Sequence, residues 1–319
     1  MLISILQKIV RDRSARIWFA GLIIIAANAG GAWSPIGDVT TTMLWIGDKV
    51  TTSNLIGYLL LPSIVCMVVP STIASFLPAF KGELDIEEDT NNKPKSKFSS
   101  TMLFLGLSAI VSVPIFKVVT HLPPYVGMML ALGVVAIFAE VYSNAKFSLT
   151  QFDSGESDAH AHHSPVHHSL SKIEMPSILF FLGILMAVAA LESLGLLFGF
   201  ATNLKESMPM MGTELAGTAV SDIVVLLLGV GSAVIDNVPL VAASLGMFAE
   251  PVDDQLWHFI AYSAGTGGSM LIIGSAAGVV AMGMEKIDFF WYLRKISWLA
   301  LLGFLAGAVV FFFTRTLFV

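Results

Sequence analysis

The feature that most constrains the fold is a series of long, nearly uncharged apolar stretches. Several approach or exceed the roughly 20 residues that an α-helix needs to cross a bilayer. Only 13% of the residues are charged, against about 25% in soluble domains, which is too few to cover a water-facing surface. The runs are continuous rather than alternating, so they predict helices. We therefore expect an all-α polytopic membrane protein with crossings at residues 17–47, 56–80, 100–116, 126–142, 176–200, 257–284 and 296–319, and a hairpin at 218–247.

The distribution of positive charge among the loops predicts the orientation of these crossings. Residues 8–16, 81–97, 146–172 and 285–295 hold 13 of the 17 Lys and Arg residues, and the alternation of crossings places all four segments on one side. Cytoplasmic loops of membrane proteins carry an excess of Lys and Arg. We therefore expect this side to be cytoplasmic, the hairpin to enter from outside and turn back, and the C-terminus to lie outside.

A weak internal repeat relates two of the crossings. They run in opposite directions, which is the pattern of an inverted-repeat transporter with interrupted helices. The predicted division is a remainder of the first repeat at 1–80, a cytoplasmic linker at 81–99 and a second repeat at 100–319. The interrupted helices are expected at 17–47 and 257–284. The repeat is carried by three glycine pairs at a constant offset of 237 residues, Gly30 with Gly267, Gly31 with Gly268 and Gly37 with Gly274.

Polar residues gather around these glycines. Each glycine in a helix costs about 1 kcal/mol relative to alanine and favours unwinding, and unwound backbone frees carbonyl groups that can bind a cation. The two breaks are therefore candidates for an ion site, with Asp38 as the expected charged ligand. Close packing of helices through small residues is an alternative that explains the glycines alone. The candidates at the breaks are Asn28, Asp38, Thr40, Thr41 and Thr266.

A second candidate lies in the predicted hairpin. Asp236 and Asn237 separate two apolar runs that are each too short to cross alone. A carboxylate in hydrocarbon costs about 2.5–3.5 kcal/mol on insertion scales, so it persists where it pairs, titrates or binds a cation. Asp236 is expected to supply charge and Asn237 a neutral oxygen, because hard cations prefer such ligands. Ser232 in the preceding arm is a further candidate. The alternative for Asp236 is a helix N-cap, which is compatible with a hairpin tip.

Other polar residues carry weaker signals. Glu192 interrupts an apolar run, where a carboxyl group would either move protons or hydrogen-bond a neighbouring helix. His258 is expected at the membrane interface and Cys66 in the core. A cluster of histidines in the loop at 146–172 is a candidate for metal binding or pH sensing, although a polar loop with no specific role is the simpler interpretation. These histidines are His160, His162, His163, His167 and His168.

Four segments resemble the NhaD-type sodium/proton antiporters of the ion transporter superfamily: Ala27–Thr41, Leu185–Gly195, Ser232–Phe248 and Ala264–Gly283. The resemblance implies two halves, each with a re-entrant hairpin and a broken helix, that bind sodium and move it by alternating access. It implies exchange of cytoplasmic sodium, or lithium, for external protons across a bacterial-type inner (plasma) membrane, with no cofactor and commonly as a homodimer. The site residues that it implies are Asp38, Thr40, Thr41, Asp236 and Asn237.

The resemblance also implies a hairpin with its own Asp-Asn tip in the first half. Subtracting the repeat offset of 237 from 236 places that tip at about position −1, before Met1. We therefore expect the sequence to begin just after half of the ion site, as a truncated form would.

Two other classes of function are alternatives. One is a sodium-coupled anion transporter for a dicarboxylate or oxyanion, in which Ser269, Thr266 and Asn28 would surround the anion near helix N-termini. Asp38 and Asp236 would repel such a substrate. The other is an intramembrane enzyme, which we do not expect because the sequence contains neither H-E-x-x-H nor G-x-S-x-G. No basic surface indicates binding of nucleic acid.

Overall fold

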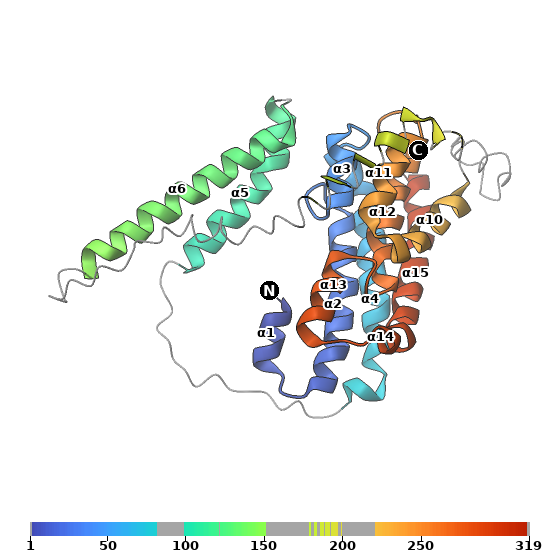
Figure 1. The fold of residues 1–319 in the computed structure, drawn as a ribbon, viewed down its shortest axis with the longest axis horizontal. Helices are drawn as coiled ribbons and strands as arrows, with labels where there is room; N and C mark the ends of the chain where they lie inside the picture. Colours follow the sequence, from blue (N-terminus) through green and yellow to red (C-terminus); the bar gives the residue numbers. More distant parts are fainter. Residues whose placement is uncertain are drawn as a thin grey trace. The chain divides into compact units, whose positions relative to one another are not determined.

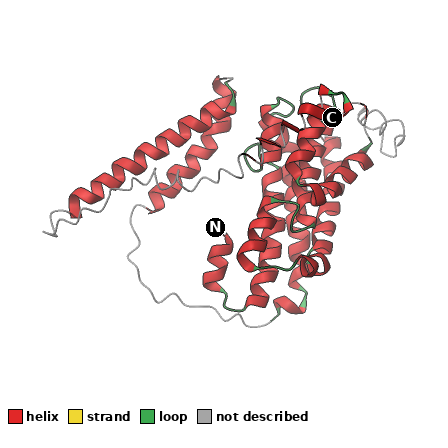
Figure 2. Ribbon diagram, viewed as in Figure 1, coloured by secondary structure: helices red, strands yellow, loops and turns green. Residues whose placement is uncertain are grey.

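The computed structural model describes residues 2–81, 99–120, 122–150 and 221–317, together with scattered positions between 179 and 199. Every regular element in these ranges is a helix (Figure 2). This confirms the predicted all-α class for the part of the chain that the structure describes.

The described residues belong to two compact units. The larger unit combines Met1–Glu88 with Gly183–Val319, and the smaller unit is Asp89–Leu182. Figure 1 shows the helices of the larger unit, with α2, α4, α12 and α15 running along it. Its helices are α1 (Leu2–Ile9), α2 (Arg13–Ala32), α3 (Val39–Ile46), α4 (Thr52–Ser75), α10 (Asp222–Ile235), α11 (Asn237–Met247), α12 (Gln255–Gly267), α13 (Ala276–Glu285), α14 (Phe289–Lys295) and α15 (Ser297–Leu317), with short 3₁₀ helices η1 (Pro78–Phe80) and η3 (Gly268–Met270).

Four described helical segments are long and apolar enough to cross a bilayer: Arg13–Ala32, Thr52–Ser75, Ser100–Thr120 and Ser297–Leu317. Large apolar side chains on these helices remain exposed, including Phe313, which is 68% exposed. Such faces fit contact with lipid, which solvates apolar side chains as water does not. The predicted crossings at these four places are therefore matched by helices of spanning length.

The two predicted interrupted helices are both interrupted in the structure. In the first, α2 ends at Ala32 and α3 begins at Val39. In the second, η3 ends at Met270 and α13 begins at Ala276. Adding the offset of 237 to residues 33–38 gives 270–275, which spans the second break. The sequence repeat therefore corresponds to a repeat of helical structure.

Close backbone contact explains a pair of glycines at each break. A Cβ atom on Gly37 would lie 2.5 Å from the carbonyl oxygen of Gly31, and a Cβ on Gly274 would lie 2.7 Å from that of Gly268. Side chains at these positions would push the two ends of each break apart. Gly30, by contrast, would meet no atom within 4 Å. The break therefore depends on Gly31 and Gly37 rather than on the adjacent pair Gly30-Gly31.

The broken helices rest on a packed set of continuous ones. α4 packs against α15, and α12 contacts both (Figure 1). Phe259 of α12 stacks on Phe311 of α15 with ring centroids 4.8 Å apart. The hydroxyl of Tyr262 donates to the backbone oxygen of Phe304 at 2.7 Å. Cys66 of α4 is 1% exposed, which confirms its predicted place in the core.

Ion pairs join helices at both ends of the larger unit. At one end, Arg315 donates two hydrogen bonds of 2.8 Å to Asp222, which connects the last turn of α15 to the first turn of α10. At the other end, Nε of Arg16 lies 3.2 Å from Oε2 of Glu285, which connects α2 to the last residue of α13. Two of the predicted loops are partly helical in the structure. The loop at 285–295 contains α14, and the loop at 8–16 ends inside α2, which includes Arg16.

A buried histidine lies near the Arg315 end of the unit. The side chain of His258 is fully buried, and its ring stacks on Tyr58 with centroids 4.6 Å apart. Its Nε2 atom lies 3.4 Å from Oδ1 of Asp253, which also accepts a hydrogen bond of 2.7 Å from the backbone nitrogen of Thr51. The side chain of His258 is thus covered by α4 and α15, and its place at the membrane interface stays a prediction.

The Asp253 carboxylate predicts a pH dependence of stability. Burial acts to raise its pKa, but the nearby His258 ring and the hydrogen bonding from Thr51 outweigh burial and lower the pKa from 3.8 to about 2. A depressed pKa means that the charged form stabilises the fold above pH about 4 and that this stabilisation is lost as the pH falls toward 2. We expect Asp253→Asn to lower the free energy of unfolding at pH 7 by about 1–2 kcal/mol.

Thermal unfolding in detergent at pH 7 and pH 3 checks this expectation, and the difference between the two proteins should shrink at pH 3. The matched control is Asp254→Asn. Asp254 caps α12 by accepting from the backbone nitrogen of Leu256 at 2.9 Å, and Asn caps a helix as well as Asp does. A pH-independent difference for Asp253→Asn would contradict the role of its charge.

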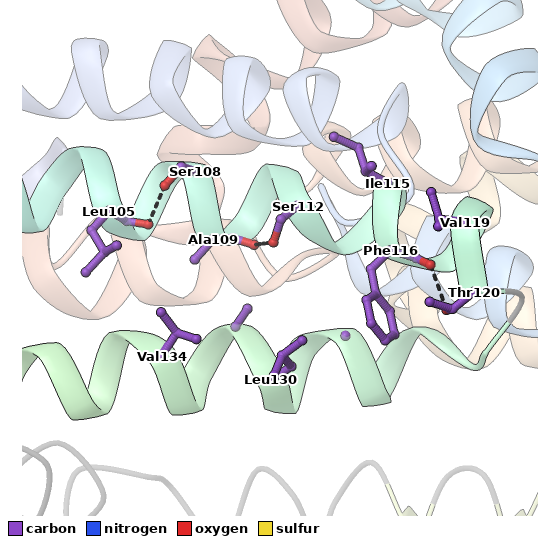
Figure 3. Close-up of a pocket in the computed structure, with 12 residues that line it drawn as sticks. Leu105, Ser108, Ala109, Ser112, Ile115, Phe116, Val119, Thr120, Leu130 and Val134 are labelled. Atoms are coloured by element: carbon purple, nitrogen blue, oxygen red, sulfur yellow. Dashed lines mark hydrogen bonds between the residues drawn. The ribbon is translucent and has the colours of Figure 1, made fainter.

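The smaller unit contains α5 (Ser99–Thr120) and α6 (Pro124–Thr150), which pack side by side. α6 continues beyond the predicted end of its crossing at residue 142 and into the predicted loop. A groove of about 560 Å³ between the two helices is lined mainly by apolar side chains such as Leu105 and Val134 (Figure 3). Its Ser108 and Ser112 hydroxyls donate to backbone oxygens of their own helix. The groove therefore offers no charge for binding an ion.

Candidate ion site

The structure brings the first break and the hairpin tip together. Asp38 directly precedes α3, and Asp236 is the single residue between α10 and α11. Nδ2 of Asn237 donates a hydrogen bond of 2.9 Å to Oδ2 of Asp38, across 199 residues of sequence. Asp236 is the chain neighbour of Asn237, so both acids lie where the first break meets the hairpin tip. Two acidic residues that the sequence singled out separately therefore belong to one cluster.

Each carboxylate of this cluster has one oxygen engaged and one oxygen without a hydrogen bond in the described part of the chain. Oδ2 of Asp38 accepts from the hydroxyl of Thr40 at 2.6 Å as well as from Asn237. Oδ1 of Asp236 accepts from the backbone nitrogen of Asn237 at 2.8 Å. Asp38 Oδ1 and Asp236 Oδ2 thus retain their lone pairs for a further ligand.

Asp236 adopts a backbone conformation that few side chains adopt. Its φ is 75° and its ψ is 145°, a region that glycine occupies easily and that costs other residues about 1–3 kcal/mol. Asp236 also terminates α10 and begins α11. The last carbonyl groups of α10 carry partial negative charge, which favours a cation beside the carboxylate. Strain of this kind is found mostly at functional sites, where the surrounding structure maintains it.

The two carboxylates differ in whether they cap the helix that follows them. Asp236 caps α11 through its bond from the backbone nitrogen of Asn237, so the N-cap interpretation and the hairpin-tip interpretation both hold for its geometry. Asp38 occupies the N-cap position of α3 but makes no side-chain cap bond. Its carboxylate is turned instead toward Thr40 and Asn237, which makes it available to the cluster.

Three other predicted candidates bond the backbone. Thr41 donates to the backbone oxygen of Ser34 at 2.8 Å and therefore holds the first break together. Ser232 donates to Gly229 at 2.7 Å, and Thr266 donates to Tyr262 at 2.6 Å. All three hydroxyl hydrogens are thus used within the helical framework, and these residues support the cluster rather than join its hydrogen bonds.

The second break has a neutral counterpart of Asp38. Nδ2 of Asn28 donates to the hydroxyl of Ser275 at 3.0 Å, and Ser275 is the N-cap of α13. Adding 237 to 38 gives 275, so the repeat places an acid at one break and a hydroxyl at the other. Ser275 was not among the predicted site residues, although the repeat offset points to it.

Some predicted residues lie outside the described part of the chain. These are Glu192 and the loop histidines His160, His162, His163, His167 and His168. Within the described residues, no group of three or more His, Cys, Asp and Glu side chains is placed to hold a metal ion. The Asp38–Asp236 cluster instead offers carboxylate and amide oxygens, which are the ligand type that hard cations prefer.

Comparison with known proteins relates this chain to transporters. The family model described as "Citrate transporter" matches residues 1–259. Sodium/proton antiporter 2 of Arabidopsis thaliana is 39% identical over 98% of this chain and 70% of its own length. The Na(+)/H(+) antiporter NhaD of Vibrio parahaemolyticus is 32% identical over 94% of this chain and 72% of its own length.

Sodium/proton antiporter 1 of Arabidopsis thaliana is 43% identical over 98% of this chain, but the alignment spans only 51% of that protein. The chain therefore covers about half the length of this relative. No solved structure matches the chain.

Proposed function

This chain belongs to the family of NhaD-type sodium/proton antiporters, and on that premise we propose that it exchanges sodium for protons across a membrane. The observation that carries the proposal is the hydrogen bond that joins Asp38 at the first helix break to Asn237, next to Asp236 at the hairpin tip. Sodium and protons are the transported cargo, and we propose no resident cofactor.

The mechanism follows from the charge of the cluster. Two carboxylates that interact in a medium of low dielectric favour neutralisation, either by a cation or by protons. Binding both at once would double the positive charge in the same place, which is unfavourable there. Competition for the same carboxylate oxygens then couples the movement of one ion to the return of the other by alternating access.

We propose that sodium, or lithium, leaves the cytoplasm while external protons enter. The excess of Lys and Arg in the segments at 8–16, 81–97, 146–172 and 285–295 supports a cytoplasmic location for that side and an outer location for the C-terminus. The resemblance supports a bacterial-type inner (plasma) membrane and a homodimer. In this scheme the two broken helices and the hairpin carry the ion cluster between the two faces.

The family model named for citrate supports a second candidate, a sodium-coupled anion transporter. The hydroxyls proposed for such an anion do not converge on it, because Ser269 donates to the backbone oxygen of Thr266 and Thr266 donates to that of Tyr262. The negative charges of Asp38 and Asp236 disfavour citrate in the same cluster. We therefore favour cation exchange.

Transport by the purified chain in proteoliposomes tests the two candidates together. A pH-sensitive dye inside vesicles with an acidic lumen should report alkalinisation after external sodium or lithium is added, and choline is the matched control. Radiolabelled citrate is added in a parallel experiment. Uptake of citrate driven by sodium, without proton release from the vesicles, would contradict the antiport proposal.

A further inference from the structure

The side-chain amide of Asn237 has a defined orientation in the ion cluster. Asn237 is 4% exposed, and its Nδ2 atom faces Oδ2 of Asp38 at 2.9 Å. In the described part of the chain, no hydrogen bond reaches its Oδ1 atom. An amide NH₂ group donates hydrogen bonds to anions and has no lone pair for a cation. The observed orientation therefore fits an ionised Asp38.

Either cargo would gain a ligand or an acceptor at Asp38 Oδ2 from the opposite orientation of this amide. Sodium between Asp38 and Asp236 would repel the NH₂ hydrogens of Asn237 and attract its carbonyl oxygen, since hard cations bind oxygen. A protonated Asp38 has an O–H group that donates, so it also needs an acceptor. Rotation about the last side-chain bond of Asn237 exchanges the amide nitrogen and oxygen without moving the backbone.

The neighbouring groups cannot take over this exchange. Thr40 already donates the hydrogen of its single hydroxyl to the same Asp38 oxygen, at 2.6 Å. Asp236, which is the titratable group facing Asp38 from the hairpin, uses Oδ1 to accept from the backbone nitrogen of Asn237. Asn237 is thus the described side chain at Asp38 that offers both a donor to the ionised carboxylate and an uncharged oxygen to the cargo.

We propose that Asn237 is a switch in the ion cluster: its amide donates to the ionised Asp38 and turns its oxygen toward sodium or toward the protonated carboxyl group. The inference rests on the proposed function, which names these two cargoes. Turning the amide breaks its bond to the ionised Asp38 and brings an uncharged oxygen to the cluster. Asn237 therefore influences how strongly sodium and protons compete for Asp38.

Side-chain amide NMR of the full chain in detergent tests the switch. The chain is labelled with ¹⁵N in asparagine side chains, and the signal that disappears in Asn237→Asp identifies Asn237. One sample receives sodium at alkaline pH, and another is acidified in choline buffer without sodium. In both we expect the hydrogen-bonded amide proton to shift upfield, because its charge-assisted bond to a carboxylate is lost.

The two samples separate failure of the switch from failure of the proposed function. An amide signal that stays unchanged while calorimetry shows sodium binding would overturn the switch. An amide that turns on acidification in a chain that binds no sodium would support the switch and contradict the sodium site. An unchanged signal in both samples would overturn the switch whatever the chain binds.

A variant adds a functional readout. Asn237→Ala should raise the pH at which protons displace half of the bound sodium by about one unit, because the anion loses a charge-assisted donor and sodium loses an oxygen ligand. Asn237→Ser should restore part of this shift, since a hydroxyl both donates and accepts. The control is Ser244→Ala on the same helix, whose hydroxyl donates to Leu240 at 2.9 Å. An Asn237→Ala midpoint equal to that of Ser244→Ala would count against the proposal.

Discussion

Replacing Asp236 by Asn is expected to reduce sodium-driven proton movement by more than about 100-fold, because it removes one of the two charges on which a bound cation depends. The substitution is otherwise conservative. Asn tolerates positive φ better than most residues, so it suits the φ of 75° at this position. Its side-chain oxygen can still accept from the backbone nitrogen of residue 237, as the Asp236 oxygen does at 2.8 Å.

The measurement is the initial rate of proton movement in proteoliposomes after a sodium pulse, with protein amount and thermal stability matched between variants. The control is Asp48→Asn. Asp48 also has a positive φ, of 50°, but it is exposed and lies at the far end of α3 from Asp38. Asp48→Asn should exchange at the parent rate. Exchange by Asp236→Asn at that same rate would remove the acid pair from the mechanism.

The second large effect is expected at the first helix break, where Gly37→Ala should destabilise the protein and Gly30→Ala should not. A Cβ atom on Gly37 would lie 2.5 Å from the backbone oxygen and 2.9 Å from the Cα of Gly31. Backbone atoms cannot rotate away as a flexible side chain can, so the break would have to open, at a cost of about 1–3 kcal/mol. Opening would also displace Asp38, which adjoins Gly37.

Gly30 is the matched control because it lies in α2, directly before Gly31, the residue that Gly37 contacts. A Cβ there meets no atom within 4 Å, and alanine in a helix is favoured over glycine by up to about 1 kcal/mol. Thermal unfolding in detergent, followed by tryptophan fluorescence, should therefore separate the two variants by about 5–10 °C. Equal melting temperatures would mean that Gly31 and Gly37 are not packed as the structure shows.

The membrane class, the helical character and the approximate crossings could be predicted because they depend on local composition. The stretches around α2, α4 and α15 are too apolar and too long for any surface in water. The repeat offset of 237 also located both helix breaks, because glycine spacing records where two backbones approach closely. These properties are encoded residue by residue and do not require knowledge of which helices meet.

The composition of the ion cluster was decided by tertiary structure. The sequence singled out Asp38 and Asp236 as separate acids and did not say which neutral polar residues would join them. In the structure, Asn237 bonds Asp38 across 199 residues and Thr40 bonds the same carboxylate. The hydroxyls of Thr41, Ser232 and Thr266 donate to backbone oxygens instead.

The physical reason lies in distance along the chain. A hydroxyl that bonds a carbonyl three or four residues away satisfies a local rule, but the bond from Asn237 to Asp38 exists only because the hairpin tip packs against the first break. The same holds for the buried pair of His258 and Asp253, whose burial depends on how α4 and α15 cover α12. Sequence therefore determined which residues are unusual in a membrane, and packing determined which of them act together.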